Sequence, residues 1–212
     1  MADESARSTI GADYAERLVR LQNAPWKRLL HVQAVFRWNL RRLEPGFTLE
    51  IGCGIGRNLE HLRGQSVGVD TNEHCVRAAV TRGLIAYTPD EFRRTPDYNQ
   101  PARFDTILLA HVAEHMTEDQ ALALVKEYLD LLRPGGRLVL IAPQEAGFRS
   151  DATHVQLMDF TRLQRISTRL GLTPERIFSF PFPRWAGRWF TYNEFVVVSR
   201  RPGGGARAAH AV

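Results

Sequence analysis

The sequence predicts an α/β fold in which a mostly parallel sheet carries helices on both faces. Short apolar runs alternate with amphipathic helical stretches along most of the chain, which is the pattern of strand–helix–strand units. A glycine-rich segment joins the first apolar run to a helix start. The chain has 212 residues and is 44% hydrophobic, which is enough to bury one full core. With no internal repeat or interdomain linker in the sequence, we expect a single domain.

The part of the chain before the first predicted strand is helical in character. Residues 13–43 predict two helices, and the second has an amphipathic pattern from Trp26 to Leu43. We expect residues 1–44 to form a helical cap on the domain, which either closes over a ligand pocket or simply packs on the sheet. Residues 45–202 then form the sheet domain, and the small residues of 203–212 predict a disordered tail.

The most informative segment is FTLEIGCGIGRNL, which begins at Phe47. An apolar strand runs into glycines 52, 54 and 56, and a helix-compatible run begins at Arg57. Glycine lets the backbone bend sharply and lets a ligand approach the main chain. The next apolar run ends at Asp70, whose carboxylate can accept hydrogen bonds from a ribose diol. The alternative is that Asp70 caps the helix that starts at Thr71 or Asn72.

The glycine spacing indicates which nucleoside is bound. A dinucleotide fingerprint reads G-x-G-x-x-G, but here the third glycine comes one residue early and Arg57 takes its place. Glu50 precedes the glycines and would repel a pyrophosphate, whereas it suits a ligand that carries an ammonium and a sulfonium group. The pattern E-x-G-x-G-x-G therefore favours a nucleoside without phosphates.

The later elements follow in a regular order. Phe104–Ala110 predicts a buried parallel strand that opens into HVAEHM, and Thr117 is the predicted N-cap of a helix that extends to Leu132. RPGG at 133–136 is expected to end this helix and turn the chain. The remaining predicted elements are a strand at Arg137–Ala142, a helix at Asp159–Leu170 and strands at Pro174–Phe180 and Tyr192–Arg200.

Taken together, LEIGCGIGRNL, the strand that ends in Asp70, FDTILLA and LRPGG resemble the class I S-adenosylmethionine-dependent methyltransferases, over about residues 45–200. The resemblance implies a Rossmann-like, seven-stranded, mostly parallel sheet with an antiparallel last strand. It also implies S-adenosyl-L-methionine as the methyl donor and S-adenosyl-L-homocysteine as the product.

The predicted cofactor site gathers residues from the ends of several strands. Cys53 is interpreted as a small filler of the turn rather than a nucleophile, because no base lies near it in the motif. Arg57 can pair with the cofactor carboxylate or with Glu60, and Asp90 or Glu91 can accept a hydrogen bond from adenine, which the resemblance places near residues 88–92. The expected cofactor-binding residues are Glu50, Gly52, Cys53, Gly54, Arg57, Asp70, Thr71, Asn72, Asp90, Ala110 and His111.

Methyl transfer from a sulfonium needs in-line positioning, and a base if the acceptor is a hydroxyl. His154, in the loop after the fifth strand, is the predicted base, with His111 and His115 as alternatives. HVAEH also matches the H-x-x-E-H pattern of some zinc peptidases, but its place at the mouth of a parallel sheet argues against that chemistry. Some quinone-pathway O-methyltransferases carry E-x-x-E-H here and hold a divalent metal. Because His111 replaces their first glutamate, we expect no metal.

The acceptor is expected to be a small molecule. AHVAEH stands where base-methylating and glutamine-methylating enzymes have [DN]-P-P-[YF], and neither cysteine follows a proline. The expected methyl acceptor is therefore a hydroxyl, or less readily an amine, of a sugar, a glycan or lipid precursor or a phenolic metabolite. The alternatives are a non-catalytic S-adenosylmethionine-binding protein and a nicotinamide-dependent oxidoreductase.

Composition bears on location and partners. The net charge of +5 comes from arginines scattered among acids, which argues against nucleic-acid binding. No apolar run approaches the ~18 residues of a membrane span, and the polar N-terminus lacks a signal core. The two cysteines show no metal spacing and fit a reducing compartment. We therefore expect a cytoplasmic protein; the oligomeric state is open.

Overall fold

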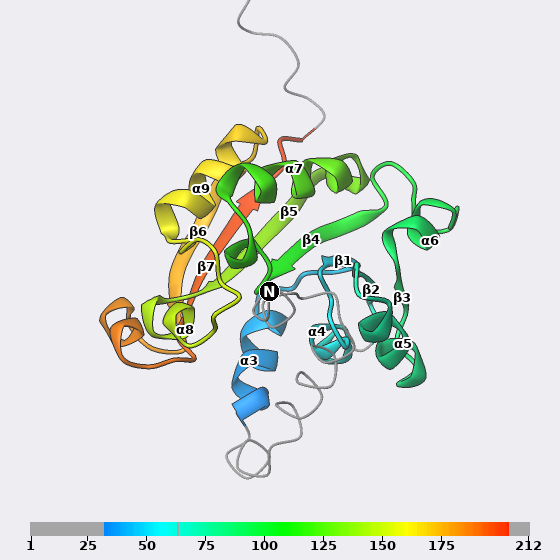
Figure 1. The fold of residues 1–212 in the computed structure, drawn as a ribbon. Coiled ribbons are helices and arrows are strands. Elements are labelled where there is room, and N and C mark those ends of the chain that lie inside the picture. The colour runs from blue at the N-terminus through cyan, green and yellow to red at the C-terminus, as the bar shows by residue number, and fades with distance from the viewer. Residues whose placement is uncertain (1–31, 63, 204–212) are drawn as a thin grey trace, which may run out of the picture.

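The structure, a computed structural model, describes residues 32–62 and 64–203 and contains one seven-stranded sheet in the order β3-β2-β1-β4-β5-β7-β6 (Figure 1). β7 runs antiparallel to both of its neighbours, and the other pairs are parallel. The predicted mostly parallel sheet with an antiparallel last strand is therefore confirmed. The strands are β1 Thr48–Ile51, β2 Ser66–Val69, β3 Ala86–Tyr87, β4 Phe104–Ala110, β5 Leu132–Pro143, β6 Thr173–Phe180 and β7 Glu194–Arg200.

Helices cover both faces of the sheet. α7 and α9 lie on one face, and α3, α4 and α5 lie on the other (Figure 1). The helices are α3 Val32–Arg41, α4 Arg57–His61, α5 Glu73–Thr81, α6 Pro89–Arg93, α7 Glu118–Tyr128, α8 Glu145–Arg149 and α9 Phe160–Arg169, with 3₁₀ turns at Ala113–His115, Leu129–Leu131 and Arg184–Arg188.

The central strand β4 shows why residues 107–110 are all apolar. Ile107 and Leu109 belong to the hydrophobic cluster that includes residues of α7 and α9, whereas Leu108 and Ala110 belong to the cluster that includes Leu40 of α3. Successive side chains of a strand point to opposite faces, so a strand buried on both faces needs apolar residues at nearly every position. The core therefore has two layers, one on each side of the sheet.

The segment around RPGG differs from the prediction. α7 ends at Tyr128, a 3₁₀ turn follows, and residues 133–136 lie inside β5 instead of forming a separate turn. Leu132 pairs with Phe104, and the register then shifts between Phe104 and Thr106. Gly135 has a φ of +73°, so a glycine absorbs the irregularity while the strand continues.

Only part of the predicted cap lies within the described residues. α3 packs on the sheet through Leu40, with Leu43 buried just after it. Residues 1–31, with the first predicted helix and the start of the second, lie outside the described residues, and so does the tail from 204 on. The boundary between cap and sheet domain stays a prediction.

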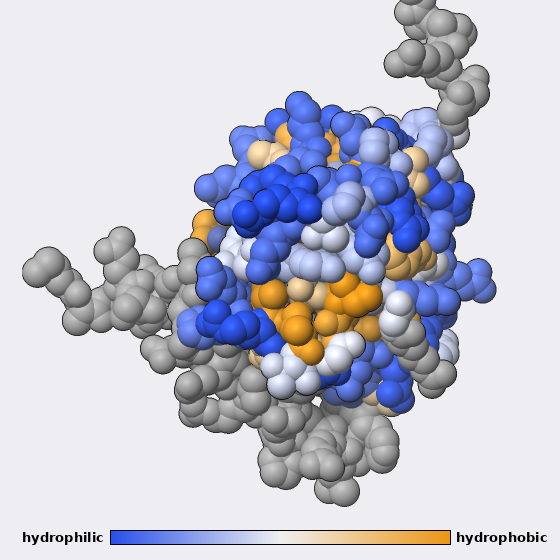
Figure 2. Space-filling model, turned by 90° about the vertical axis from the view of Figure 1, so that its right-hand side faces the viewer, coloured by the Kyte–Doolittle hydropathy of each residue, from blue (hydrophilic) through white to orange (hydrophobic). Residues whose placement is uncertain are grey.

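The side of the molecule that carries β3, α5 and α6 shows an apolar patch among polar side chains (Figure 2). Val80 and Ile85 are the large apolar residues exposed in this region, at 51% and 36%. Within the described chain, no helix is both long and apolar enough to cross a membrane.

Candidate active site at the carboxyl edge of the sheet

The turn after β1 requires glycine at two positions. Gly52 has a φ of +72°, and a Cβ there would lie 2.3 Å from Cγ2 of Val112. Gly56 has a φ of +82°, and a Cβ would lie 2.5 Å from Cδ1 of Leu84. Any other residue would combine a strained backbone with a steric clash. The turn therefore brings bare main chain to the carboxyl edge of the sheet.

Asp70 connects the end of β2 to this turn. Its Oδ2 accepts a hydrogen bond from the Gly54 amide at 2.7 Å, and its Oδ1 accepts from the Asn72 amide at 2.8 Å. Asn72, and not Asp70, is the N-cap of α5, because its side chain accepts from the amides of residues 74 and 75. Burial raises the pKa of Asp70, against the effect of its two backbone donors. Each carboxylate oxygen can accept a further hydrogen bond, so a ribose diol fits here.

A cavity of about 400 Å³ opens beside the turn. Five of the predicted cofactor residues border it, namely Gly52, Gly54, Asp70, Thr71 and His111. The other lining residues are Ile51, Val69, Pro89, Arg93, Val112, His115, Met116, Leu124, Glu127 and Tyr128. A lining of apolar residues with a few polar groups is typical of a small-molecule pocket.

Glu50 is almost completely buried, with 2% of its surface exposed. Its Oε1 accepts a hydrogen bond from Nδ2 of Asn58 at 2.7 Å, and its Oε2 has no hydrogen-bond partner in the described chain. Burial raises the pKa of Glu50 to about 8, although Asn58 and Arg57 act in the opposite direction. A cation placed beside this carboxylate would offset the cost of burying it with one oxygen unpaired.

Six predicted cofactor residues do not line the first cavity, namely Glu50, Cys53, Arg57, Asn72, Asp90 and Ala110. The thiol of Cys53 faces the core, because a Cβ at Gly68 would lie 2.5 Å from its sulfur, and burial raises its pKa well above the usual range. Ala110 and Arg57 line a second cavity instead. Glu60, the alternative partner of Arg57, forms an ion pair with Arg82.

The segment after β3 reaches the first cavity through Pro89. The carboxylate of Glu91 accepts hydrogen bonds from the amide and hydroxyl of Thr88 at 2.8 and 2.9 Å, which completes a capping box. Asp90 is exposed and forms an ion pair with Arg93 at 2.5 Å. Both predicted adenine acceptors thus already have intramolecular partners.

The second cavity, of about 280 Å³, lies next to the first, and His111 and His115 border both. α3 supplies one wall, so the described part of the cap covers this cavity and not the first. The lining residues are Gln33, Phe36, Asn39, Leu40, Arg57, Asn58, Ala110, His111, Glu114, His115, Ile141, Pro143, Gly147, Ser150, Asp151, His154, Thr191, Tyr192 and Glu194.

His111 sits between two acidic side chains. Its Nε2 lies 2.7 Å from Oε1 of Glu194, and its Nδ1 lies 3.4 Å from Oε1 of Glu114. Burial acts to lower the pKa of His111, but the two carboxylates outweigh it and raise the pKa to about 9. The residue also has a φ of +58°, a strained conformation for a residue other than glycine. At neutral pH it is an imidazolium, which can donate protons to hydrogen bonds but cannot act as a base.

His115 and His154 form a second pair. Their rings pack edge to face with centroids 4.9 Å apart. Nδ1 of His115 lies 3.2 Å from the carbonyl oxygen of Thr153, and Nδ1 of His154 lies 2.7 Å from that of Phe148. Burial lowers the pKa of His115. Each Nδ1 must carry a proton to donate to a carbonyl oxygen, so in the neutral rings Nε2 holds the free lone pair.

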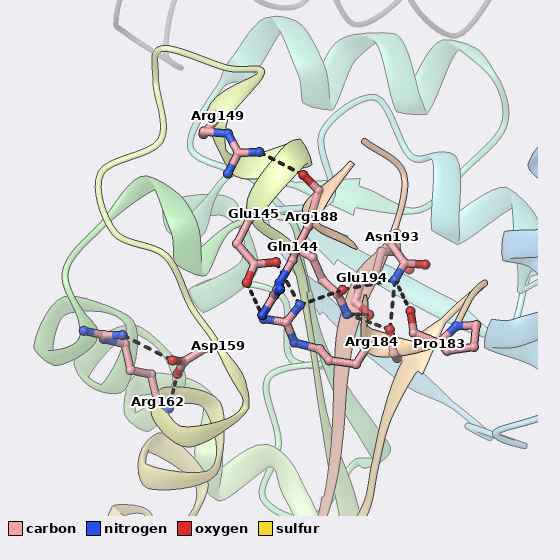
Figure 3. A network of polar contacts seen from close by, with 11 residues as sticks. Gln144, Glu145, Arg149, Asp159, Arg162, Pro183, Arg184, Arg188, Asn193 and Glu194 are labelled. Atoms are coloured by element: carbon pink, nitrogen blue, oxygen red, sulfur yellow. Dashed lines mark hydrogen bonds and ion pairs between the residues drawn. The ribbon is translucent and has the colours of Figure 1, made fainter. Parts of the chain in front are cut away.

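Figure 3 shows a buried amide pair, Gln144 and Asn193, whose sequence neighbours Pro143 and Glu194 line the second cavity. Asn193 donates from Nδ2 to Oε1 of Gln144 at 3.0 Å, and Gln144 donates from Nε2 to the backbone oxygen of Glu194 at 2.9 Å. Arg184 and Glu145 form a bidentate ion pair beside them. These contacts tie the end of β5 to the start of β7 and thereby hold Glu194 against His111.

Sequence analysis did not identify Glu114, Glu194, Gln144 or Asn193 as site residues. Glu114 lay within the HVAEH motif, and Glu194 is the one charged residue at the head of the apolar run EFVVV. The amide pair has no signal in the sequence, because its members are far apart and belong to no motif.

The comparisons with known proteins agree with this geometry. A family model described as "Methyltransferase domain" matches residues 22–177, which is more than half of the chain. A search of the curated proteins found no match.

Several solved structures share the fold at low sequence identity. A SAM-dependent methyltransferase from Archaeoglobus fulgidus has 18% identity and a TM-score of 0.63, with 80% of this chain and 94% of that chain covered. Magnesium protoporphyrin IX methyltransferase from Synechocystis PCC 6803, with bound SAH, has 17% identity and a TM-score of 0.64, with 92% and 97% covered. A protein solved in work on the conversion of a disulfide bond into a thioacetal group during echinomycin biosynthesis has 20% identity and a TM-score of 0.59, with 80% and 82% covered.

The nicotinamide alternative is therefore rejected, because the family match and the E-x-G-x-G-x-G turn point to the same cofactor, S-adenosyl-L-methionine. The chain belongs to the class I S-adenosylmethionine-dependent methyltransferases.

Proposed function

We propose that this methyltransferase transfers the methyl group to a hydroxyl, or less readily an amine, of a small molecule such as a sugar, a glycan or lipid precursor or a phenolic metabolite. One observation carries the proposal: His111 and His115 border both cavities. A molecule in the second cavity would therefore meet the cofactor at these two residues.

The lining of the second cavity supports a hydroxylated acceptor. Asn39, Glu114, Asp151, Tyr192 and Glu194 offer hydrogen-bonding groups among apolar walls. Its volume of about 280 Å³ suits a small molecule. Trp185 and Trp189 are 65% and 73% exposed and do not line it.

The arrangement of the histidines supports a role for the His115–His154 pair as the proton acceptor. The raised pKa of His111 removes it as a base at neutral pH, whereas the lowered pKa of His115 keeps that ring neutral. The acceptor oxygen attacks the methyl carbon as the carbon–sulfur bond breaks, and the electron pair of that bond goes to sulfur. The hydroxyl proton goes to a free Nε2 of the pair.

A turnover screen tests the proposal. Purified protein is incubated with methyl-labelled S-adenosylmethionine and a panel of sugars, phenols and lipid-linked glycans, together with amines and the carboxylate acceptor magnesium protoporphyrin IX. Labelled ether products formed with an equal amount of S-adenosylhomocysteine support hydroxyl methylation. Labelling of only the porphyrin contradicts it, and tight cofactor binding without turnover on any acceptor favours the non-catalytic alternative.

A further inference from the structure

Three potential ligand groups meet at the edge of the second cavity. The carboxylate of Glu114 and the imidazoles of His115 and His154 each offer one atom, and these atoms lie within 4.8 Å of one another. We propose that they bind one divalent first-row transition-metal ion, with Zn²⁺ as the representative. The inference deepens the proposed function and rests on it for the role of the ion, which would assist deprotonation of the acceptor in place of a free histidine.

Glu114 provides the first argument. It is 1% exposed, and neither carboxylate oxygen has a hydrogen-bond partner among the residues that the structure describes. The nearest cationic group is Nδ1 of His111, at 3.4 Å. Leaving a buried carboxylate without hydrogen bonds is costly. A bound cation satisfies this carboxylate and accounts for its burial.

The two histidines are already oriented for coordination. The carbonyl oxygens of Thr153 and Phe148 hold the Nδ1 atoms of His115 and His154, which leaves both Nε2 lone pairs free. A hydrogen bond from the other ring nitrogen to a carbonyl is the usual support for a metal-binding histidine, because it fixes both the tautomer and the ring orientation.

The backbone holds the ligands together across two segments. The amides of Val155 and Gln156 donate to the carbonyl oxygen of Glu114 at 2.7 and 3.2 Å. The ring of His154 also stacks on Phe148, with centroids 5.4 Å apart. Ligands about 2.1 Å from one tetrahedral ion are about 3.4 Å apart. The three side chains therefore need to close by no more than about 1.4 Å, which side-chain rotation provides.

The ligand set also selects the kind of ion. Two imidazoles and one carboxylate suit Zn²⁺, Co²⁺ or Fe²⁺, whereas Mg²⁺ and Ca²⁺ prefer oxygen ligands alone. All three residues line the second cavity, so an ion held by them would be within reach of an acceptor in that cavity. A hydroxyl that binds such an ion would ionise more readily. From the sequence we expected no metal, because His111 replaces the first glutamate of E-x-x-E-H. The ligand set proposed here includes His154 instead, which comes from the loop after α8 and not from HVAEH.

Zinc titration of the untagged, metal-free full chain tests the inference. Calorimetry should show one Zn²⁺ per chain, and Co²⁺ should give visible absorption bands of a low-coordinate site. Glu114→Gln, His115→Ala and His154→Ala should each weaken Zn²⁺ binding by about tenfold or more. The control His74→Ala removes an exposed histidine of α5 and should leave the affinity unchanged. Circular dichroism confirms that each variant is folded, and millimolar Mg²⁺ should not compete.

Absence of Zn²⁺ binding would overturn the inference, and so would binding that all three variants retain. The titration uses no acceptor, so its outcome is independent of the turnover screen. Methylation of a hydroxyl at full rate without metal would support the proposed function and contradict a role for the ion. Binding of one ion at this site without methylation of any hydroxyl would support the metal site and contradict the proposed function.

Discussion

Nε2 of His111 lies 2.7 Å from Oε1 of Glu194, and this contact joins residues 83 positions apart in the chain. His111 follows the carboxyl end of β4, and Glu194 begins β7. Because β7 is the antiparallel strand, its first residue lies at the edge where the parallel strands end. The reversed strand thus delivers a carboxylate to the active-site edge.

Replacing this carboxylate should destabilise the protein. Glu194→Gln keeps a hydrogen-bond acceptor but removes the charge that compensates the imidazolium, and we expect a loss of about 1–2 kcal/mol. Chemical unfolding at pH 7 measures it. The matched control is Glu175→Gln, which breaks an ion pair with Arg200 on the exposed edge of the same sheet and should cost less than about 1 kcal/mol. Equal losses in the two variants would mean that the His111–Glu194 pair contributes no more to the free energy of unfolding than an exposed ion pair does.

Cofactor affinity should depend on pH through Glu50. In the free protein, burial raises the pKa of Glu50 to about 8, compared with 4.5 for an ordinary glutamate. Its carboxyl group is therefore mostly protonated below pH 8. Glu50 therefore lowers folding stability as pH rises from about 4.5 to 8. A cofactor ammonium beside it favours the carboxylate, so binding releases the proton.

We expect affinity for S-adenosylhomocysteine to rise with pH toward about 8, by at most about tenfold per pH unit, and then to level off. Calorimetry in two buffers of different ionisation enthalpy measures the proton released. Glu50→Gln cannot ionise and corrects for titration of the ligand itself. If the variant and the original protein show the same pH dependence, Glu50 does not meet the ammonium.

The sequence predicted most of the sheet because its signals are local. The apolar run FDTILLA and the glycine turn depend on neighbouring residues, and both lie where they were expected. RPGG was misjudged, because proline and glycine usually end an element, whereas here pairing of Leu132 with Phe104 extends the strand through them. Tertiary pairing outweighed a local turn signal.

The candidate site was predicted only in part, for a related reason. Glycines and Asp70 belong to a compact motif, so sequence spacing was enough to bring them together. Nδ1 of His154 is held by the backbone carbonyl oxygen of Phe148, and no side-chain pattern in the sequence encodes such a contact. The neighbouring carboxylate of Asp151 accepts hydrogen bonds from the amide and hydroxyl of Thr153.

Asp70→Ala should weaken cofactor binding by ~1–3 kcal/mol, because the ribose diol loses its charged acceptor and the Gly54 amide loses its partner. Calorimetry with S-adenosylhomocysteine measures the change. Thr117→Ala serves as the control, since it removes the N-cap of α7 at a distance from the turn and should lower stability by about 1 kcal/mol without changing affinity. Unchanged affinity in folded Asp70→Ala protein would leave Asp70 only its role in holding the turn.

The last prediction separates the three histidines by the cavities that they border. His154 lines only the second cavity, so His154→Ala should lower turnover by ~10²–10⁴-fold and leave cofactor affinity nearly intact. His115 borders both cavities, and its loss should reduce turnover and cofactor affinity together. Single-turnover rates at saturating cofactor, with His74→Ala as the control, give the comparison. Full activity in His154→Ala, combined with loss in His111→Ala, would move the proton acceptor to the end of β4. That result would also mean that His111 loses its proton when the cofactor is bound, despite the two neighbouring carboxylates. An imidazolium has no lone pair with which to take the acceptor's proton.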